Sequence, residues 1–485
     1  MIRTAPIDKE VRNTQIPFRK FPGIASVADG AGAAVWVESH IAQAASGYPV
    51  QPARAMAEAF EDLVGRGARN LWRQPLQMLR AESAQDAASI CEGYALTGGR
   101  AVSFASGQAL PAMNEALRTI AGKRLPLIFH VGARALQSQA LATRTGHDDI
   151  CSVDDCGWGI VFARDVQEVA DLALICRSAA EYSETPFFVV QDAYATTHQI
   201  QDVLLPEPDL MRLFVGAPDE KLSNHFNPRR PAMISPVQEE GDYSASRLAQ
   251  RGFFGRAAAA LQASIDEYAR LTGRVVAGAE GYLLEDAEHV LLGCGSMMDD
   301  ACRAVDGLRA RGVLAGAVTL RTFRPFPAEA LREMLANAIT VSVIERTDMP
   351  LALANPLTLS VSAALGVSPL AGASSVSGLR LFTRSVGLGA TRVAETEFSD
   401  VIEHAVAATA RPASVVRPGA LPPSFRSALQ ASESALAAAS LPTGLALVRA
   451  GGSGAANANR LIATVSRALF GLRIDAEGDA GTEKV

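Results

Sequence analysis

The sequence lacks the features that mark membrane, exported and nucleic-acid-binding proteins. No segment offers about eighteen uninterrupted apolar residues, and the stretch from Met1 to Lys20 carries charges throughout and no apolar h-region. Its 45 lysines and arginines are outnumbered by 51 aspartates and glutamates, so a formal net charge of −6 provides no phosphate-neutralising surface. We therefore expect a cytoplasmic protein that binds neither membranes nor nucleic acids.

Cysteine is also scarce. None of the six cysteines has the two-residue spacing to another that zinc or iron–sulfur sites use, and Cys151 and Cys156 come closest to it. A reducing compartment disfavours disulfides. We expect no metal site and no cluster built by this chain alone.

Aromatic residues make up only 6% of the sequence, whereas hydrophobic residues make up 48% and charged residues 20%. This alanine-rich balance is typical of a globular protein rather than a disordered one. At 485 residues the chain is long enough for two or three domains, each with its own core.

The segment around Ala101–Gln108 indicates the fold class. It is a short apolar run that ends in small and polar residues, and similar runs follow at Leu125–Arg134 and Pro186–Asp192. Helical patterns at Pro111–Ala121 and Val166–Ala180 separate them, so the sequence predicts an α/β fold with a parallel sheet. Ligands of such sheets bind at the carboxyl ends of the strands.

Those strand ends define a candidate crevice. They carry Ser106-Gly107-Gln108, Gly132-Ala133-Arg134 and Gln191-Asp192-Ala193-Tyr194, which bring one fixed cation together with several hydrogen-bonding groups.

Three further helices are expected before and around this crevice, at Gly32–Ala45, Ala53–Gly65 and Glu82–Gly93. Between the first two, Pro49 and Pro52 forbid a helix and hold the chain extended. This rigid loop places Gln51 against a ligand or serves as a plain connector.

A series of motifs resembles, in order and spacing, the α subunit or first two domains of the pyruvate:ferredoxin oxidoreductase family. They are Gly47-Tyr-Pro49, Phe104–Gln108, Phe129–Arg134, His147–Ile150, Asp192–Ile200, Asn227–Tyr243, Tyr268–Arg274, Val290–Ser296, Leu320–Phe326, Ile344–Thr347 and Gly387–Gly389. The resemblance covers roughly residues 26 to 410. It implies a pyrimidine-binding thiamine diphosphate domain with a parallel sheet, followed by an α/β domain similar to the transketolase C-terminal domain.

The resemblance also divides the chain into segments. They are an N-terminal extension (1–28), the thiamine diphosphate domain (29–225), an interdomain insertion and helix (226–275), the transketolase-like domain (276–410), a proline- and alanine-rich linker (411–441), and a βα unit at 442–485 that resembles the start of the family's γ domain.

For chemistry, the resemblance implies that this chain receives the aminopyrimidine end of thiamine diphosphate. The family's diphosphate and magnesium site uses a Gly-Asp-Gly stretch followed by an asparagine, which this sequence lacks. We therefore expect a β-type partner subunit that completes the cofactor site and carries iron–sulfur clusters, with γ- and ferredoxin-like subunits, in a dimer of heteromers. The substrates would be a 2-oxoacid and coenzyme A.

Several residues acquire roles from the same resemblance. Arg134 matches the family arginine that fixes the substrate carboxylate, a task that suits a guanidinium fork, and Gln51 stands where the family has a substrate-binding threonine. The alternative for Arg134 is a structural salt bridge. The cofactor-contacting positions are Tyr48, Pro49, Ser106, Gly107 and Gln108.

This sequence departs from the family pattern at the position of the family's catalytic glutamate. Counting back from Phe104, its position holds Ala84, whereas carboxylates lie at Glu82 and Asp86. Two residues along a helix rotate a side chain by roughly 200°. Glu82 could therefore replace the glutamate only if the stretch before it is not helical; otherwise the site is silent.

Two other motifs allow alternative interpretations. His147-Asp148-Asp149 suggests a metal site, but adjacent residues do not easily converge on one ion, so we expect a solvated loop. Gly293-Cys294-Gly295-Ser296 suggests a phosphate nest, but we expect its glycines to let a strand and a helix approach closely.

Three functions remain open from the sequence. The first is the catalytic α-type subunit of a 2-oxoacid oxidoreductase, which forms acyl-CoA and CO2 and passes electrons to ferredoxin or NAD(P) through clusters on a partner. The second is a non-catalytic scaffold subunit of such a complex. The third is a non-oxidative thiamine-dependent decarboxylase or carboligase.

Overall fold

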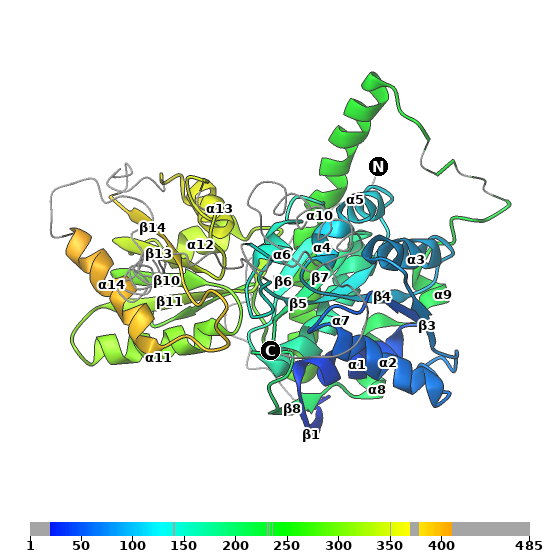
Figure 1. The fold of residues 1–485 in the computed structure, drawn as a ribbon, viewed down its shortest axis with the longest axis horizontal. Coiled ribbons are helices and arrows are strands. Elements are labelled where there is room, and N and C mark those ends of the chain that lie inside the picture. The colour runs from blue at the N-terminus through cyan, green and yellow to red at the C-terminus, as the bar shows by residue number, and fades with distance from the viewer. Residues whose placement is uncertain are drawn as a thin grey trace, which may run out of the picture. The chain divides into compact units, whose positions relative to one another are not determined.

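The computed structural model describes residues 20–138, 141–229, 231, 233–234, 236–349, 351–368 and 378–409 (Figure 1). The chain divides into two units, residues 1–422 and 423–485, and every described residue belongs to the first. The linker expected at 411–441 and the βα unit expected at 442–485 lie outside the described residues.

Seven strands form the larger sheet, in the order β12-β6-β7-β5-β4-β2-β3. Their bounds are β2 Ala44–Gly47, β3 Gln77–Arg80, β4 Ala101–Ala105, β5 Ile128–Ala133, β6 Gly159–Phe162, β7 Phe187–Asp192 and β12 Thr322–Arg324. Strands β2 to β7 pair in parallel, and β12 pairs antiparallel with β6. The predicted parallel sheet is confirmed, and the six parallel strands end at one edge.

Helices cover both faces of this sheet. One face packs against α3 (Ala84–Leu96), α4 (Ala109–Ala112) and α5 (Asn114–Gly122), so the expected Pro111–Ala121 helix is two helices that meet at Met113. The opposite face packs against α1 (Gly30–Ile41), α2 (Arg54–Gly65) and α7 (Val166–Ser183).

The predicted end of the helix expected at Gly32–Ala45 is wrong. Helix α1 stops at Ile41, and Ala44–Gly47 is the buried strand β2 in the interior of the sheet. The sequence Ala-Ala-Ser-Gly contains no β-branched or aromatic residue, so its composition gives no strand signal. The loop after β2 therefore leaves the carboxyl edge of the sheet directly.

The remaining elements of the first domain connect or flank this layer. They are the antiparallel pair β1 (Ile24–Ala28) and β8 (Gln201–Leu205), and helices α6 (Asp148–Cys151), α8 (Pro208–Val215), α9 (Pro218–Lys221) and α10 (Glu240–Thr272). Helix α10 packs against α7.

A five-stranded sheet forms the second domain, in the order β14-β13-β10-β11-β9. The strands are β9 Ala279–Tyr282, β10 His289–Gly293, β11 Ala315–Leu320, β13 Thr340–Glu345 and β14 Arg380–Ser385, and the helices are α11 Met297–Arg309, α12 Ala328–Met334, α13 Pro356–Leu365 and α14 Glu395–Thr409. All strands but β9 are parallel. Helices α11 and α14 pack on one face, and α12 and α13 lie against the other.

The two domains share strand β12 and one hydrophobic core. Strand β12 comes from the second domain in sequence but pairs with β6 at the edge of the larger sheet. Val290 and Val341 of the second sheet belong to the same buried cluster as Phe129 of the first. The carboxyl ends of β7 and β10 also meet, because Ser296 donates hydrogen bonds to Asp192.

A buried ion cluster supports the first domain beneath this region. Glu38 of α1 contacts Nε2 of His130 at 3.1 Å and Nη2 of Arg177 at 2.9 Å, and all three side chains are fully buried. Burial alone would raise the pKa of Glu38, but Arg177 and His130 outweigh it and hold the pKa below its usual value.

None of the described helices combines the length and the hydropathy that crossing a membrane requires.

Candidate functional site

The carboxyl ends of β4 and β5 are held together by one buried carboxylate. Asp149 Oδ2 accepts hydrogen bonds from the backbone N–H of Gly107 at 2.8 Å and from that of Arg134 at 3.0 Å. Its Oδ1 accepts a third from Ile150 at 2.8 Å. Because it fixes both strand ends, Asp149 determines how the predicted residues Gly107 and Arg134 lie.

Gly107 and Arg134 are in close contact. Gly107 has φ +54°, and a Cβ there would come within 2.8 Å of Arg134 Nε. Only glycine therefore lets the β4 loop approach the guanidinium this closely. The Nε atom is buried and has no hydrogen-bond partner among the described residues.

The Arg134 guanidinium also connects two loops. Nη1 donates to the carbonyl oxygen of Gln51 at 2.8 Å, and Nη2 donates to that of Ala142 at 3.0 Å. The Gln51–Pro52 peptide bond is cis, and the Gln51 side chain is exposed. The structure thus brings together both residues that the sequence predicted for substrate binding, with Arg134 touching the Gln51 main chain.

The other predicted cofactor positions lie at the ends of β2 and β4. Ser106 is buried and donates to the carbonyl oxygen of Gly132 at 2.5 Å, which joins β4 to β5. Gln108 is exposed at the start of α4, Tyr48 is half-buried and Pro49 is exposed. Of this group, Tyr48, Pro49 and Gln108 have surface that a ligand could contact.

The residues near the expected position of the family glutamate lie at the start of helix α3. Ser83 caps α3 through its side chain, which accepts from the N–H of Asp86 at 3.1 Å, so Glu82 precedes the helix and is exposed. Ala84 is the first residue of α3, is only 6% exposed and belongs to the same apolar cluster as Val50. A buried methyl group thus lies at the position where the sequence count from Phe104 predicts the family's glutamate.

The loop His147–Asp149 is not solvated, so that expectation is wrong. His147 is 5% exposed and Asp149 is fully buried. Burial raises the pKa of Asp149 to about 8, although three backbone N–H groups oppose the shift. The sequence pattern gave no indication of this burial, because the contacts come from Gly107 and Arg134, which are distant in the chain.

Asp192, at the carboxyl end of β7, joins the first domain to the second. Its carboxylate contacts His147 Nε2 at 2.8 Å, Ser296 N and Oγ at 2.9 and 2.6 Å, and Arg346 Nε at 3.6 Å. Burial alone would raise the pKa of Asp192, but the charges of His147 and Arg346 hold it well below the usual range.

Gly293 lets strand β10 and helix α11 approach closely, as expected, because a Cβ there would come within 2.9 Å of Met298 Sδ. Gly295 permits a different close approach. Gly295 has φ +77°, and a Cβ there would come within 2.8 Å of Asp192 Oδ2. The loop that could have bound a phosphate therefore binds a carboxylate of its own chain.

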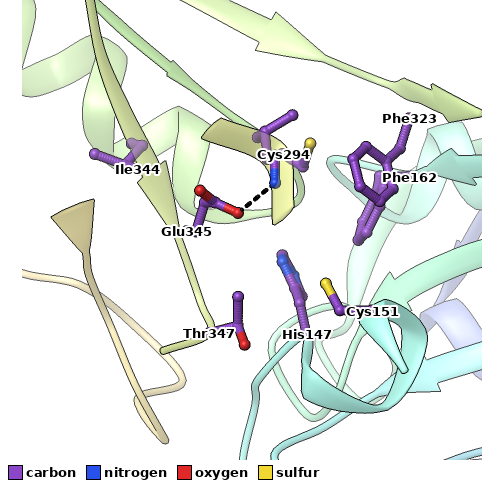
Figure 2. Close-up of a pocket in the computed structure, with 9 residues that line it drawn as sticks. His147, Cys151, Phe162, Cys294, Phe323, Ile344, Glu345 and Thr347 are labelled. Atoms are coloured by element: carbon purple, nitrogen blue, oxygen red, sulfur yellow. Dashed lines mark hydrogen bonds between the residues drawn. The ribbon is translucent and has the colours of Figure 1, made fainter. Parts of the chain in front are cut away.

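A small cavity lies next to this junction (Figure 2). Its lining includes His147, Cys151, Phe162, Cys294 and Glu345, and it leaves about 20 Å³ for the centre of a water molecule, room for roughly one water. Glu345 accepts from the N–H of Leu357 at 2.7 Å, the bond drawn in Figure 2. This cavity is too small for a 2-oxoacid and is not lined by Gln51, Glu82 or Arg134.

No metal centre is formed by the part of the chain that the structure describes, where no three histidine, cysteine or acidic side chains gather suitably. All six cysteines are free thiols. Burial raises the pKa of Cys151 and Cys294 well above the ordinary value, which leaves both thiols unreactive.

Two family models match the chain. Residues 39–262 match the model described as pyruvate flavodoxin/ferredoxin oxidoreductase, thiamine diphosphate-binding, and residues 287–380 match pyruvate:ferredoxin oxidoreductase core domain II. The first match contains every predicted site residue, from Tyr48 to Arg134.

Curated relatives are similar over the same region. The pyruvate-flavodoxin oxidoreductase of Klebsiella pneumoniae is 30% identical over 336 residues, 69% of this chain and 29% of the relative. The pyruvate:ferredoxin oxidoreductase of Moorella thermoacetica is 30% identical over 340 residues, 70% of this chain and 29% of the relative. The chain thus spans less than a third of the length of these relatives.

A solved structure has the same fold. The 2-oxoglutarate:ferredoxin oxidoreductase of Magnetococcus marinus aligns with a TM-score of 0.61 and 15% identity, covering 79% of this chain and 65% of that one. At this identity the likeness concerns the fold alone. On the two family models and the relatives that share them, the chain belongs to the pyruvate:ferredoxin oxidoreductase family, of which it carries the thiamine diphosphate-binding domain and core domain II.

Proposed function

We propose that the chain is the α-type subunit of a multi-subunit, thiamine-diphosphate-dependent 2-oxoacid oxidoreductase. The complex would convert a 2-oxoacid and coenzyme A into acyl-CoA and CO2 and pass the electrons to iron–sulfur clusters on partner subunits. The observation that carries this proposal is the convergence of Gln51, Gly107 and Arg134 at the carboxyl edge of the sheet, in a chain of this family.

The residues at this edge meet part of what thiamine diphosphate and its substrate require. The Nε of Arg134, which has no partner among the described residues, and the close backbone approach at Gly107 suit a hydrogen-bonding or anionic ligand. When bound, the coenzyme supplies the electron sink for decarboxylation. This chain would supply the cation for the substrate carboxylate, since a guanidinium fork binds it in a fixed orientation.

Other parts of the site would come from the partner. The sequence has no Gly-Asp-Gly stretch for the diphosphate and magnesium, and the described acidic groups do not form a metal site. We therefore assign the magnesium, the diphosphate and the clusters to a β-type subunit, in a dimer of heteromers with γ- and ferredoxin-like subunits.

A second candidate function is a non-catalytic scaffold of the same complex. The observation that favours it is the burial of Ala84, which stands where the resemblance predicts the glutamate that activates the pyrimidine ring. In this case the chain would keep the fold and the partner contacts and would contribute no turnover.

Reconstitution tests the proposed function. The purified chain with thiamine diphosphate and magnesium should not decarboxylate pyruvate or 2-oxoglutarate, whereas the complex with its β-type partner should form acyl-CoA. Turnover by the chain alone would refute the divided site. An assembled complex that binds thiamine diphosphate but is inactive with every 2-oxoacid would favour the scaffold.

A further inference from the structure

The loop at residues 144–149 lies between the carboxyl end of β5 and the second domain. It leads into helix α6, and its residues Thr145, His147 and Asp149 are buried. Hydrogen bonds attach the loop to both neighbours. The loop therefore connects the strand end that carries Arg134 with a domain that holds none of the predicted site residues.

On the β5 side, three consecutive backbone N–H groups donate hydrogen bonds to the loop. These bonds run from Arg134 to Asp149 Oδ2 at 3.0 Å, from Ala135 to the carbonyl oxygen of Arg144 at 2.9 Å, and from Leu136 to Asp148 Oδ2 at 3.1 Å. Gly146 lets the two segments lie close together, because a Cβ there would come within 2.7 Å of Ala135 N. The position of the loop therefore determines the main-chain position from which the Arg134 guanidinium extends.

On the opposite side, residues that follow β13 and β14 hold the same loop. The bonds run from His147 N–H to the carbonyl oxygen of Arg346 at 2.9 Å, from Gly389 N–H to the carbonyl oxygen of Thr145 at 3.1 Å, and from Thr347 Oγ1 to Asp148 Oδ1 at 2.6 Å. Figure 2 shows Thr347 and His147 on the two chain segments that meet here. The second domain thus fixes both the backbone and a side chain of the loop.

The two sets of bonds meet at Asp148. Its Oδ1 accepts from Thr347 and its Oδ2 accepts from the N–H of Leu136, so one carboxylate joins the second domain to the chain two residues beyond Arg134. Hydrogen bonds to an ionised acceptor are stronger than neutral ones. Thr347 is itself held in place, because Asn355 Nδ2 donates to its carbonyl oxygen at 3.0 Å.

We propose that Thr347 of the second domain is a positioning residue for Arg134. By binding Asp148, Thr347 holds the 144–149 loop against the end of β5. The loop in turn holds the main chain of Arg134, so the guanidinium meets its ligand in a fixed orientation. The consequence for a 2-oxoacid rests on the function proposed above, whereas the hold of Thr347 on the loop does not.

Hydrogen exchange of the purified full-length chain tests this hold without any activity. Thr347→Val removes the hydroxyl and keeps the shape, so the amides of residues 134–136 should exchange at least about fivefold faster than in the wild type. The amides of β10 should keep their wild-type rates, which would show that the second domain is folded. Thr347→Ser keeps the hydroxyl and should exchange as the wild type does.

Asp154→Asn is the matched control for the exchange experiment. It weakens a different contact between the same two domains, the 2.6 Å ion pair of Asp154 with Arg324, and should leave the amides of residues 134–136 unchanged. Exchange at residues 134–136 that is the same in Thr347→Val and in the wild type would overturn the proposal.

Steady-state kinetics of the assembled complex tests the action on Arg134. Thr347→Val should raise the KM for the 2-oxoacid about three- to tenfold and leave the KM for coenzyme A unchanged. In an Arg134→Ala background the same change should have no further effect, because a residue that acts through Arg134 then has nothing to position. An equal rise in KM in both backgrounds would overturn the positioning role. Faster exchange in Thr347→Val, together with no turnover by the wild-type complex, would contradict the proposed function but still support the hold of Thr347 on the loop.

Discussion

Arg134 donates a hydrogen bond from Nη1 to the carbonyl oxygen of Gln51 at 2.8 Å, across 83 residues of sequence. The contact joins the carboxyl end of β5 to the loop that follows β2. A residue of this kind has two separable tasks, since it fixes a loop through its Nη atoms and keeps its Nε free of partners within the described chain. The first prediction concerns these two tasks.

In the assembled complex, Arg134→Ala should raise the KM for the 2-oxoacid and lower kcat/KM. The loss of transition-state stabilisation should be about 2–5 kcal/mol, as expected when one partner of a buried charge pair is removed. Arg134→Lys should recover only part of this, because it keeps the charge but loses the fork. Steady-state kinetics with both substrates provides the check. A purely structural arginine would change the KM values for the 2-oxoacid and for coenzyme A alike.

Asp149 is expected to behave as a buried, proton-holding group. Burial raises its pKa to about 8, above the ordinary value of 3.8. The folded state therefore binds more protons than the unfolded state between about pH 4 and 8, so this group's contribution to stability falls as the pH rises, by at most about 1.4 kcal/mol per pH unit. Asp149→Asn should lack this decline.

Urea unfolding of the wild type and of Asp149→Asn, at several pH values from 5 to 8.5, measures the difference. Asp149→Ala serves as the second variant and should lose about 2–4 kcal/mol at pH 5, because the N–H groups of Gly107 and Arg134 lose their acceptor. This loss should shrink as the pH rises to 8, because alanine has no group to titrate. Parallel pH profiles for the wild type and the asparagine variant would show that Asp149 is ionised in the fold.

The parallel sheet, the helix at Val166–Ser183 and the loop that bears Gln51 were predictable because each depends on local patterns: apolar runs, helical periodicity and paired prolines. Strand β2 was not, since Ala44–Gly47 has the composition of a helix or a turn and becomes a strand only through its pairing with β3 and β4. Tertiary context overrides propensity there.

The candidate site residues at the strand ends could be found from the sequence. The buried carboxylates that hold these strand ends in place could not. Asp149 and Asp192 acquire their roles from partners at Gly107, Arg134 and Ser296, which no periodicity connects to them. One signal was available: the three adjacent polar residues His147-Asp148-Asp149, which lie within a family motif. Their pattern favoured a solvated loop and gave no indication of burial.

Asp192→Asn should destabilise the fold by about 3–5 kcal/mol at pH 7, because it leaves the buried Arg346 without its carboxylate and weakens the bond to His147. The depressed pKa of Asp192 means that its contribution is complete above about pH 4 and is lost only as the pH falls through the lower, folded-state pKa. Denaturant unfolding at pH 7 measures the loss. Asp155→Asn is the control, since that carboxylate forms an exposed pair with Arg118 and should cost less than about 1 kcal/mol; equal losses in the two variants would contradict a special role for Asp192.

The last prediction concerns Glu82 and Ala84, on which the choice between a working and a silent site depends. Glu82 precedes the Ser83 cap, so the helical rotation of roughly 200° that would turn it away from the position of Ala84 does not apply to it. If Glu82 bonds the pyrimidine ring, the carboxylate must share a proton with the coenzyme, and Glu82→Gln should lower kcat by about 10²-fold. Because Glu82 is exposed, the melting temperature should not change.

Asp86→Asn is the matched control for Glu82→Gln, because Asp86 is an exposed carboxylate in the first turn of α3 and should leave kcat unaltered. Full activity of Glu82→Gln, in a complex shown to bind thiamine diphosphate at this chain, would exclude Glu82 as the replacement.

In a silent site, Ala84→Glu should instead introduce thiamine binding, measurable by calorimetry. It should also destabilise the chain without the coenzyme, since Ala84 lies in the apolar cluster with Val50. We expect the loss of activity in Glu82→Gln, because the buried Nε of Arg134 at the end of β5 has no partner within the described part of the chain and can bind an anionic or polar ligand, which a site without a coenzyme would not supply.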